Sequence, residues 1–272
     1  CICRAGLKNR SEFRANKRPA SSIVVWCRTQ VNTSISDRSS RVAWLTPFAT
    51  NKIAVIYAQG EIIYGKGNED LIGQELIIEA LRKARKDKNV KAIVLRINSP
   101  GGSALASELI WRELELTKNE LPLVVSMGDL AASGGYYIGC AADSIFVQPN
   151  TITGSIGVFG IIPNFQNLLN NKLGVTFDGV KTGKYADIMS VNRPLTAGER
   201  FIIQNDVNHV YDTFLTRVAD GRKKTKAQVD SVGGGHVWVG TDAVKIGLAD
   251  RLGSFNDAIK SAAKETASQS SK

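Results

Sequence analysis

The stretch LPLVVSMGDLAASGGYYIGCAAD, residues 121–143, decides the fold of this chain, because an apolar run passes directly into small residues around one serine, Ser133. The apolar part is typical of a buried strand, and the small residues after it favour a short helix that packs closely on that strand. Close packing alone would explain the glycines. It does not easily explain the whole arrangement around Ser133.

The segments on either side of this stretch alternate between strands and helices. Before it, we expect a strand and turn over 52–63, an amphipathic helix over 71–87, a buried strand over 91–100 and a helix over 103–118. After it, we expect a strand over 144–149, a turn over 150–157, a strand over 158–162, helices over 164–173 and about 196–220, a short strand from 236 and two further helices. Strands joined by crossover helices pair in parallel, so the order of elements predicts an α/β fold.

The chain divides into a leader and one domain. Residues 1–50 show no sustained helical or strand period, and we expect a leader that is disordered or not native; a basic membrane- or partner-binding arm is the alternative. We expect residues 51–272 to form a single domain, since they contain no internal repeat and no linker.

The net charge of +10 belongs mainly to this leader, which holds nine Lys or Arg residues against two acidic ones. It therefore does not indicate that the domain binds nucleic acid. No apolar run reaches the roughly 18 residues that span a bilayer. The four cysteines form no C-x-x-C pair, and Cys140 lies among alanines, so we expect no metal site, no disulfide framework and no cofactor.

Two glycine-rich loops follow two of the expected strands and open the next helix: NSPGGS at 98–103 and DLAASGG at 129–135. Amide groups at a helix start are unpaired and can bind an anion or a developing oxyanion. Neither loop contains a nucleotide-binding motif. A carbonyl attacked by Ser133 could accept hydrogen bonds from Gly134 and from Gly101 or Gly102, which predicts acyl-transfer chemistry; tight packing of strand on helix is the alternative.

A serine nucleophile needs a base, and the sequence does not position one. The two histidines, His209 and His236, lie far from both loops in sequence, so a Ser-His-Asp triad stays open. Lys181 and Lys184 could serve only if their pKa fell by about three units, and otherwise they are solvated loop residues. KTG and SAAK imitate penicillin-binding motifs, but their order is reversed and SDN is missing, so we reject that family.

Three long motifs resemble peptidase family S49, the signal peptide peptidase family: AIVLRINSPGGSALASELIWREL, PLVVSMGDLAASGGYYIGCAADSIFVQPNTITGSIGVFG and GGHVWVGTDAVKIGLADRLGSFNDAI. The resemblance covers about residues 52–265 and implies a ClpP/crotonase-like fold of stacked strand-strand-helix units. It implies that Ser133 is the nucleophile of a Ser-Lys dyad and that Ser155 hydrogen-bonds the catalytic lysine. The oxyanion site would be formed by Gly101, Gly102 and Gly134.

One position departs from the family pattern. Short members carry the lysine after the tyrosine of a segment similar to KTGKYADIMS, where this chain has Ala186. Long members, built from two homologous halves, take the lysine from their amino-terminal half. The chain therefore resembles the carboxyl-terminal half of a long member, and the missing half would supply the base. Lys184, two residues away, could substitute only if the loop shifted.

The resemblance implies a serine endopeptidase that hydrolyses hydrophobic peptides such as cleaved signal peptides. It also implies a homo-oligomeric ring and a location at the periplasmic face of the bacterial inner membrane. Two alternatives remain open at this stage. One is a non-catalytic, ring-forming module that binds peptides, and the other is acyl-CoA chemistry of the crotonase kind.

Overall fold

A computed structural model of the chain describes residues 25–28 and 51–269. It forms two compact units: unit 2 is Gly157–Phe214, and unit 1 comprises the described residues before and after it. Most of the leader predicted over 1–50 lies outside the described residues. Its residues Val25–Arg28 form a strand, β1, that pairs with the first strand of the domain.

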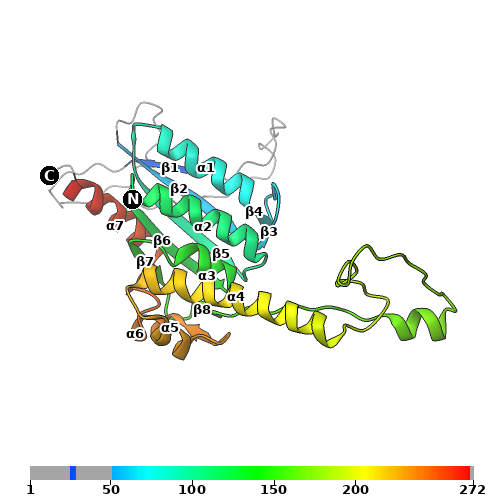
Figure 1. The fold of residues 1–272 in the computed structure, drawn as a ribbon. Helices are drawn as coiled ribbons and strands as arrows, with labels where there is room; N and C mark the ends of the chain where they lie inside the picture. Colours follow the sequence, from blue (N-terminus) through cyan, green and yellow to red (C-terminus); the bar gives the residue numbers. More distant parts are fainter. Residues whose placement is uncertain (1–24, 29–50, 270–272) are drawn as a thin grey trace. The chain divides into compact units, whose positions relative to one another are not determined.

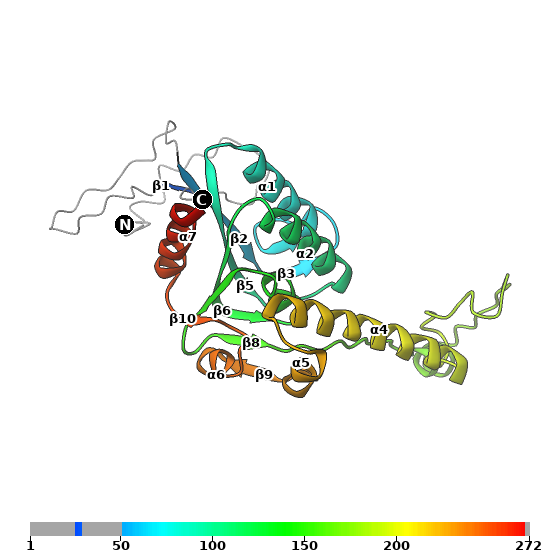
Figure 2. The same cartoon turned by 60° about the vertical axis from the view of Figure 1, so that its left-hand side comes forward.

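Unit 1 is built around one large sheet in the order β1-β2-β5-β6-β7-β10 (Figure 1; β10 is labelled in Figure 2). All neighbours in this order are parallel except β1 and β2, which are antiparallel. A short strand, β8, pairs with the end of β6 and with β9, and β3 and β4 form a separate two-stranded sheet. The bounds are β2 Lys52–Gln59, β3 Glu61–Ile63, β4 Leu71–Gly73, β5 Val90–Ser99, β6 Leu123–Ala132, β7 Ser144–Val147, β8 Ile152–Gly154, β9 Val237–Val239 and β10 Arg251–Leu252.

Helices cover both faces of this sheet. Two long helices, α1 and α2, lie side by side on one face, and α7 lies against the other (Figures 1 and 2). The short helix α3 follows β6 directly. The bounds are α1 Gln74–Lys86, α2 Ala104–Lys118, α3 Gly134–Gly139, α4 Ala197–Arg222, α5 Lys226–Val232, α6 Gly240–Lys245 and α7 Phe255–Gln269.

The core forms because alternate side chains of each strand point to opposite faces of the sheet. On one face, Val55, Val94 and Val124 from three neighbouring strands pack against Ala258 and Ala262 of α7. Their neighbours in sequence face α1 and α2, so the central strands are buried on both sides and read as continuous apolar runs. This explains why the run before Ser133 is so uniformly apolar.

Three departures from the sequence predictions lie close together, one at the end of the first part of unit 1 and two at the start of unit 2. The turn expected over 150–157 contains β8, because Ile152–Gly154 finds pairing partners in two other strands. The strand expected over 158–162 does not form, since these apolar residues have no strand beside them. The helix expected over 164–173 is a short π-helix, Asn167–Lys172.

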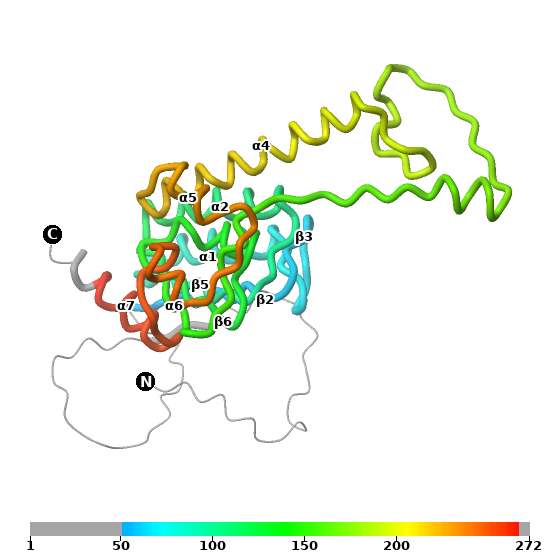
Figure 3. Tube along the Cα trace, turned by 90° about the horizontal axis from the view of Figure 1, so that it is seen from below, coloured from blue at the N-terminus to red at the C-terminus, as the bar shows by residue number. Residues whose placement is uncertain are grey.

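Figure 3 traces unit 2 from the extended residues after Gly157, through this π-helix and a long loop, into the first part of α4. Few of its apolar side chains are buried within the unit. Among the described residues, none of the helices combines the length and apolar character that a membrane crossing requires.

Candidate active site

Ser133 lies where β6 ends and α3 begins, in a conformation that non-glycine residues seldom adopt. Its φ is 51° and its ψ is −122°. Such a backbone costs roughly 1–3 kcal/mol and persists only where the surroundings fix it. The Ser133 amide donates to the carbonyl of Gly154 (2.9 Å), and the Ser133 carbonyl accepts from the amide of Tyr137 (2.9 Å). Both bonds hold the serine at a sharp corner between strand and helix.

The loop after β5 approaches this corner so closely that no side chain fits between them. A Cβ atom on Gly101 would lie 2.6 Å from the amide nitrogen of Gly134 and 2.9 Å from Cβ of Ser133. The position of a Cβ on Gly134 is 3.3 Å from the amide nitrogen of Gly102. The φ of Gly101 is 101°, which also favours glycine. The two glycine loops predicted from the sequence therefore meet beside Ser133.

The three glycines differ in how their amides are used. The Gly101 amide donates to Oγ of Ser99 (3.1 Å), while its carbonyl accepts from the amide of Ile62 (2.8 Å). In the part of the chain that the structure describes, neither the Gly102 amide nor the Gly134 amide has a hydrogen-bond acceptor. Two free amides beside a serine hydroxyl could stabilise a negatively charged oxygen, whereas Gly101 provides the space around them.

Ser155 lies next to Ser133 because their strands pair in register. Ala132 of β6 is opposite Gly154 of β8, and each serine is the next residue. Ser155 also has a positive φ, of 49°, and its amide donates to the carbonyl of His236 (2.7 Å). The structure thus brings Ser133, Ser155 and the glycine loops together within unit 1.

Unit 1 does not assemble a serine–histidine pair from its described residues. The hydroxyls of Ser133 and Ser155 have no hydrogen-bond partner there. The His236 side chain is exposed, and its Nδ1 is 2.6 Å from the carbonyl of Gly233, a contact within its own turn. His209 is exposed on α4, within unit 2.

The lysines singled out in the sequence belong to unit 2. The Lys184 side chain is exposed, and its ammonium lies 5.2 Å from the centre of the Tyr185 ring, a contact typical of a charged lysine. The Lys181 ammonium forms an ion pair with Asp187 (2.8 Å). Ala186, at the position of the family's lysine, is also exposed.

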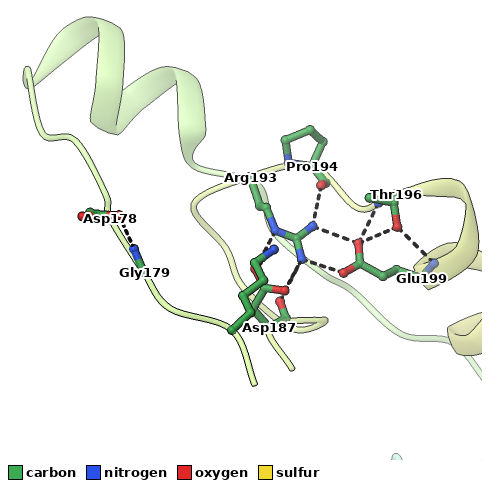
Figure 4. Close-up of polar contacts among 8 residues, drawn as sticks. Asp178, Gly179, Asp187, Arg193, Pro194, Thr196 and Glu199 are labelled. Carbon is green, nitrogen blue, oxygen red and sulfur yellow. Dashed lines mark hydrogen bonds and ion pairs between the residues drawn. The ribbon is translucent and has the colours of Figure 1, made fainter. Parts of the chain in front are cut away.

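The segment that carries these lysines is cross-linked by one arginine, as Figure 4 shows. Nε of Arg193 donates to Oδ2 of Asp187 (2.9 Å), and its two terminal nitrogens donate to Glu199 (2.8 and 2.6 Å). Glu199 also accepts from the amide of Thr196 (2.7 Å), and its own amide donates to the Thr196 hydroxyl (3.3 Å). This reciprocal pair is a capping box at the start of α4.

Hydrogen bonds from Arg193 are the main reason why the pKa values of Asp187 and Glu199 are lowered. The pKa of Glu199 falls to about 2. Both therefore stay ionised at neutral pH, and the arginine is held in a forked geometry. Sequence reasoning missed this cluster, although the spacing of Thr196 and Glu199 ahead of a helix is a recognisable capping signal.

A second cluster that sequence reasoning missed anchors α3 itself. The Tyr136 hydroxyl donates to the carbonyl of Leu248 (2.8 Å), and the Tyr137 hydroxyl donates to the carboxylate of Glu108. Burial is the main cause that raises the pKa of both phenols, so both remain hydrogen-bond donors. No local signal in the sequence connects Tyr137 with a residue 29 positions earlier.

Comparison with protein families gives two matches. Residues 115–269 match peptidase family S49, and residues 19–165 match the ClpP-like SDH-type serine proteinases. Among solved structures, a ClpP1 variant from Listeria monocytogenes has a TM-score of 0.50 at 17% identity, and covers 75% of this chain and 93% of that one. This likeness confirms the predicted ClpP-like α/β fold.

Curated relatives give the same result. The chain is 48% identical over 213 residues to Protease 4 of Haemophilus influenzae, which covers 78% of this chain and 34% of that one. It is 47% identical over 212 residues to Protease 4 of Salmonella typhi, with the same coverage. The chain therefore spans about a third of the length of these relatives. The resemblance stated from the motifs is confirmed.

Proposed function

The chain belongs to peptidase family S49, and on that premise we propose that it supplies the nucleophile, Ser133, of a serine endopeptidase that hydrolyses hydrophobic peptides such as cleaved signal peptides. The observation that carries the proposal is the corner at Ser133, where a strained serine lies beside two amides without acceptors. A purely structural turn needs neither the strain nor the open amides.

The proposed reaction begins when Oγ of Ser133 attacks the carbonyl carbon of a peptide bond and a neutral lysine accepts the hydroxyl proton. The carbonyl oxygen becomes an oxyanion that accepts hydrogen bonds from the amides of Gly102 and Gly134. Collapse of this intermediate breaks the C–N bond, and the leaving amine takes the proton from the lysine. Water then hydrolyses the acyl-enzyme ester. Each oxyanion donor of this kind contributes roughly 10²–10³ in rate.

We propose that the lysine comes from outside these residues, from the amino-terminal part of a longer protein in which this chain is the carboxyl-terminal half. Three features support this. Ala186 stands at the lysine position of short family members, Lys184 makes a contact typical of its charged form, and the chain matches only a third of Protease 4. Ser155, beside Ser133, would then orient the incoming lysine.

A hydrophobic substrate is supported by the surface around the oxyanion amides. Gly102 bridges to Ile62 of β3. Tyr64, just after β3, and Leu105, in the first turn of α2, flank this bridge in sequence and are 66% and 59% exposed. Exposed apolar side chains beside a reactive group favour binding of apolar peptide side chains.

Assembly into a ring of identical chains is also part of the proposal, and unit 2 supports it. Its exposed apolar side chains include Phe159, Ile161 and Val180, which are 85%, 83% and 100% exposed. Such side chains are typical of surfaces that other protein chains cover. The partner we propose is a second copy of the chain. A location at the periplasmic face of the inner membrane stays a prediction from family resemblance.

One alternative has its own supporting observation. The serine hydroxyls have no base among the described residues of unit 1, so the chain alone could bind peptides in the ring without cleaving them. The two functions differ in whether Ser133 ever forms an ester.

Hydrolysis of an unstructured hydrophobic peptide tests the proposal. The assay compares the purified chain with Ser133→Ala, with Lys184→Ala and with Ser231→Ala as an exposed-serine control, each with and without the remaining part of the longer protein. We expect cleavage only when that part is present, and its loss only in Ser133→Ala. Cleavage by the chain alone that Lys184→Ala abolishes would assign the base to Lys184. Absence of cleavage in every mixture, with peptide still bound, would favour the binding module.

A further inference from the structure

A charged cluster outside the reacting groups joins helix α3 to α2 and α4. The Tyr137 hydroxyl of α3 donates to Oε2 of Glu108 in α2, and Nη2 of Arg217 in α4 donates to Oε1 of the same carboxylate (2.6 Å). The Arg217 guanidinium also lies 4.0 Å from the centre of the Trp111 ring. All four residues belong to unit 1. Glu108 thus accepts hydrogen bonds from one residue of the serine's helix and from one residue of α4.

The cluster lies only one helical turn from Ser133. Helix α3 has only six residues, and the Tyr137 amide bonds directly to the Ser133 carbonyl (2.9 Å). A movement of Tyr137 therefore reaches Ser133 through a single turn. The neighbouring residue, Tyr136, is fixed to the carbonyl of Leu248. Tyr137 therefore adds a second side-chain anchor to α3.

The strained conformation of Ser133 requires support from its surroundings. A φ of 51° persists only where neighbouring contacts over-determine it. Arg217 directs two nitrogens at the carboxylate of Glu108, at 2.6 and 3.4 Å. These contacts fix the orientation in which the carboxylate accepts the hydrogen bond from Tyr137. We propose that Glu108 and Arg217 are positioning residues that hold Ser133 in its strained conformation through Tyr137. The catalytic meaning rests on the proposed role of Ser133, but the conformational effect does not.

Hydrogen exchange of single amides, measured by NMR on the full chain, tests the proposal without any hydrolysis assay. The reporters are the amides of Ser133 and Tyr137, and Val94 in the sheet centre reports global unfolding. The variants are Glu108→Gln and Arg217→Met. The control is Arg82→Met, which removes a similar arginine–glutamate pair between α1 and α2, at Glu113.

We expect exchange at both reporters to rise about fivefold or more in the two variants, with Val94 and the control unchanged. Tyr137→Phe should give the same increase at Ser133, and adding Glu108→Gln to it should give no more, because both act along one path. Arg217→Lys, which keeps the charge but not the fork, should restore only part of the effect.

Two results would overturn the proposal. One is reporter exchange within twofold of the unmodified chain in both variants. The other is equal acceleration at Val94, because that would make the cluster a general stabiliser. Neither result bears on whether Ser133 attacks peptides, since Ser133→Ala decides that separately by loss of cleavage.

Discussion

The amide of Ser133 donates a hydrogen bond of 2.9 Å to the carbonyl oxygen of Gly154, and this bond continues the pairing of β6 with β8 one residue past the end of β6. It places Ser155, the residue after Gly154, beside Ser133. Both serines have a positive φ, which only three non-glycine residues share in the part of the chain described by the structure. Two of the three are thus at the candidate site.

The strain at Ser155 predicts different outcomes for two small substitutions. Ser155→Gly relieves the positive φ, whereas Ser155→Ala keeps the strain, so the glycine variant should be more stable by about 1 kcal/mol. Both lose the hydroxyl, so both should lose peptidase activity to a similar degree. Urea denaturation measures the first effect and peptide cleavage the second. Equal stabilities would show that φ is not strained in solution.

A methyl group should destabilise the protein far more at Gly101 than at Gly65, a glycine with a similar φ but open space around it. Gly65 has a φ of 112° and nothing within 4 Å of its Cβ position, whereas a Cβ on Gly101 would meet Gly134 at 2.6 Å. We expect Gly65→Ala to cost about 1 kcal/mol and Gly101→Ala at least ~2 kcal/mol. Denaturation midpoints give the comparison. A difference below the error of the fit would mean that the loops separate easily.

Ala186→Lys should restore a base at the position where short family members have one. We expect the variant to cleave a hydrophobic peptide on its own, at least ~10²-fold faster than the unmodified chain. The gain should vanish in Ala186→Lys/Ser133→Ala and survive in Ala186→Lys/Lys184→Ala. A variant that folds normally but stays inactive would count against this assignment of the lysine position.

The ion pairs of Glu199 should make the start of α4 sensitive to acid. Its pKa is lowered from 4.5 to about 2, mainly by hydrogen bonds from Arg193. Because the pKa of Glu199 is lower in the folded than in the unfolded chain, the ionised carboxylate stabilises the folded state at any pH above about 4.5. This stability is lost as the pH falls from about 4.5 towards 2. An NMR titration of the Glu199 carboxyl should show a midpoint near 2 that rises in Arg193→Met.

Lys181→Met serves as the control for this titration, because Lys181 pairs with Asp187 and not with Glu199. Its Glu199 midpoint should stay near that of the unmodified chain. An unchanged midpoint in Arg193→Met would show that Arg193 does not contact Glu199 in solution.

Cys140 should react only when the domain unfolds. Its thiol is fully buried directly after α3, and burial raises its pKa to about 12. The reactive thiolate is therefore absent near pH 8. Peptide-resolved labelling with iodoacetamide should leave Cys140 unmodified in buffer and modify it fully in denaturant. Rapid labelling in buffer would reveal local opening beside Ser133.

The sequence predicts those features that depend on local pattern. The apolar runs before Gly101 and Ser133 identify buried parallel strands, and the glycines after them identify loops that must pack closely. The two loops meet at Ser133, as their positions after neighbouring strands imply. Pattern alone does not predict β8, because three residues in a glycine-rich turn become a strand only through partners far along the chain.

Long-range pairs are beyond local pattern for the same reason. Glu108 and Arg217 are 109 residues apart, and nothing in either segment marks the other as its partner. The strand expected over 158–162 was wrong in the opposite sense, since a short apolar run forms a strand only where another strand is available to pair with. The start of α4 was predictable, but the link from Glu199 to Arg193 was not.

The interior place of β6 has a consequence for the durability of the molecule. The peptidase proposed above would meet other copies of itself, and its own chain is made of the bonds that it would cut. To be cleaved, a segment must leave its partners and lie extended in another copy's site. Strand β6 pairs with β5 along one edge and with β7 and β8 along the other, so freeing it means dismantling the sheet. The backbone leading to Ser133 is therefore among the last that self-digestion could reach.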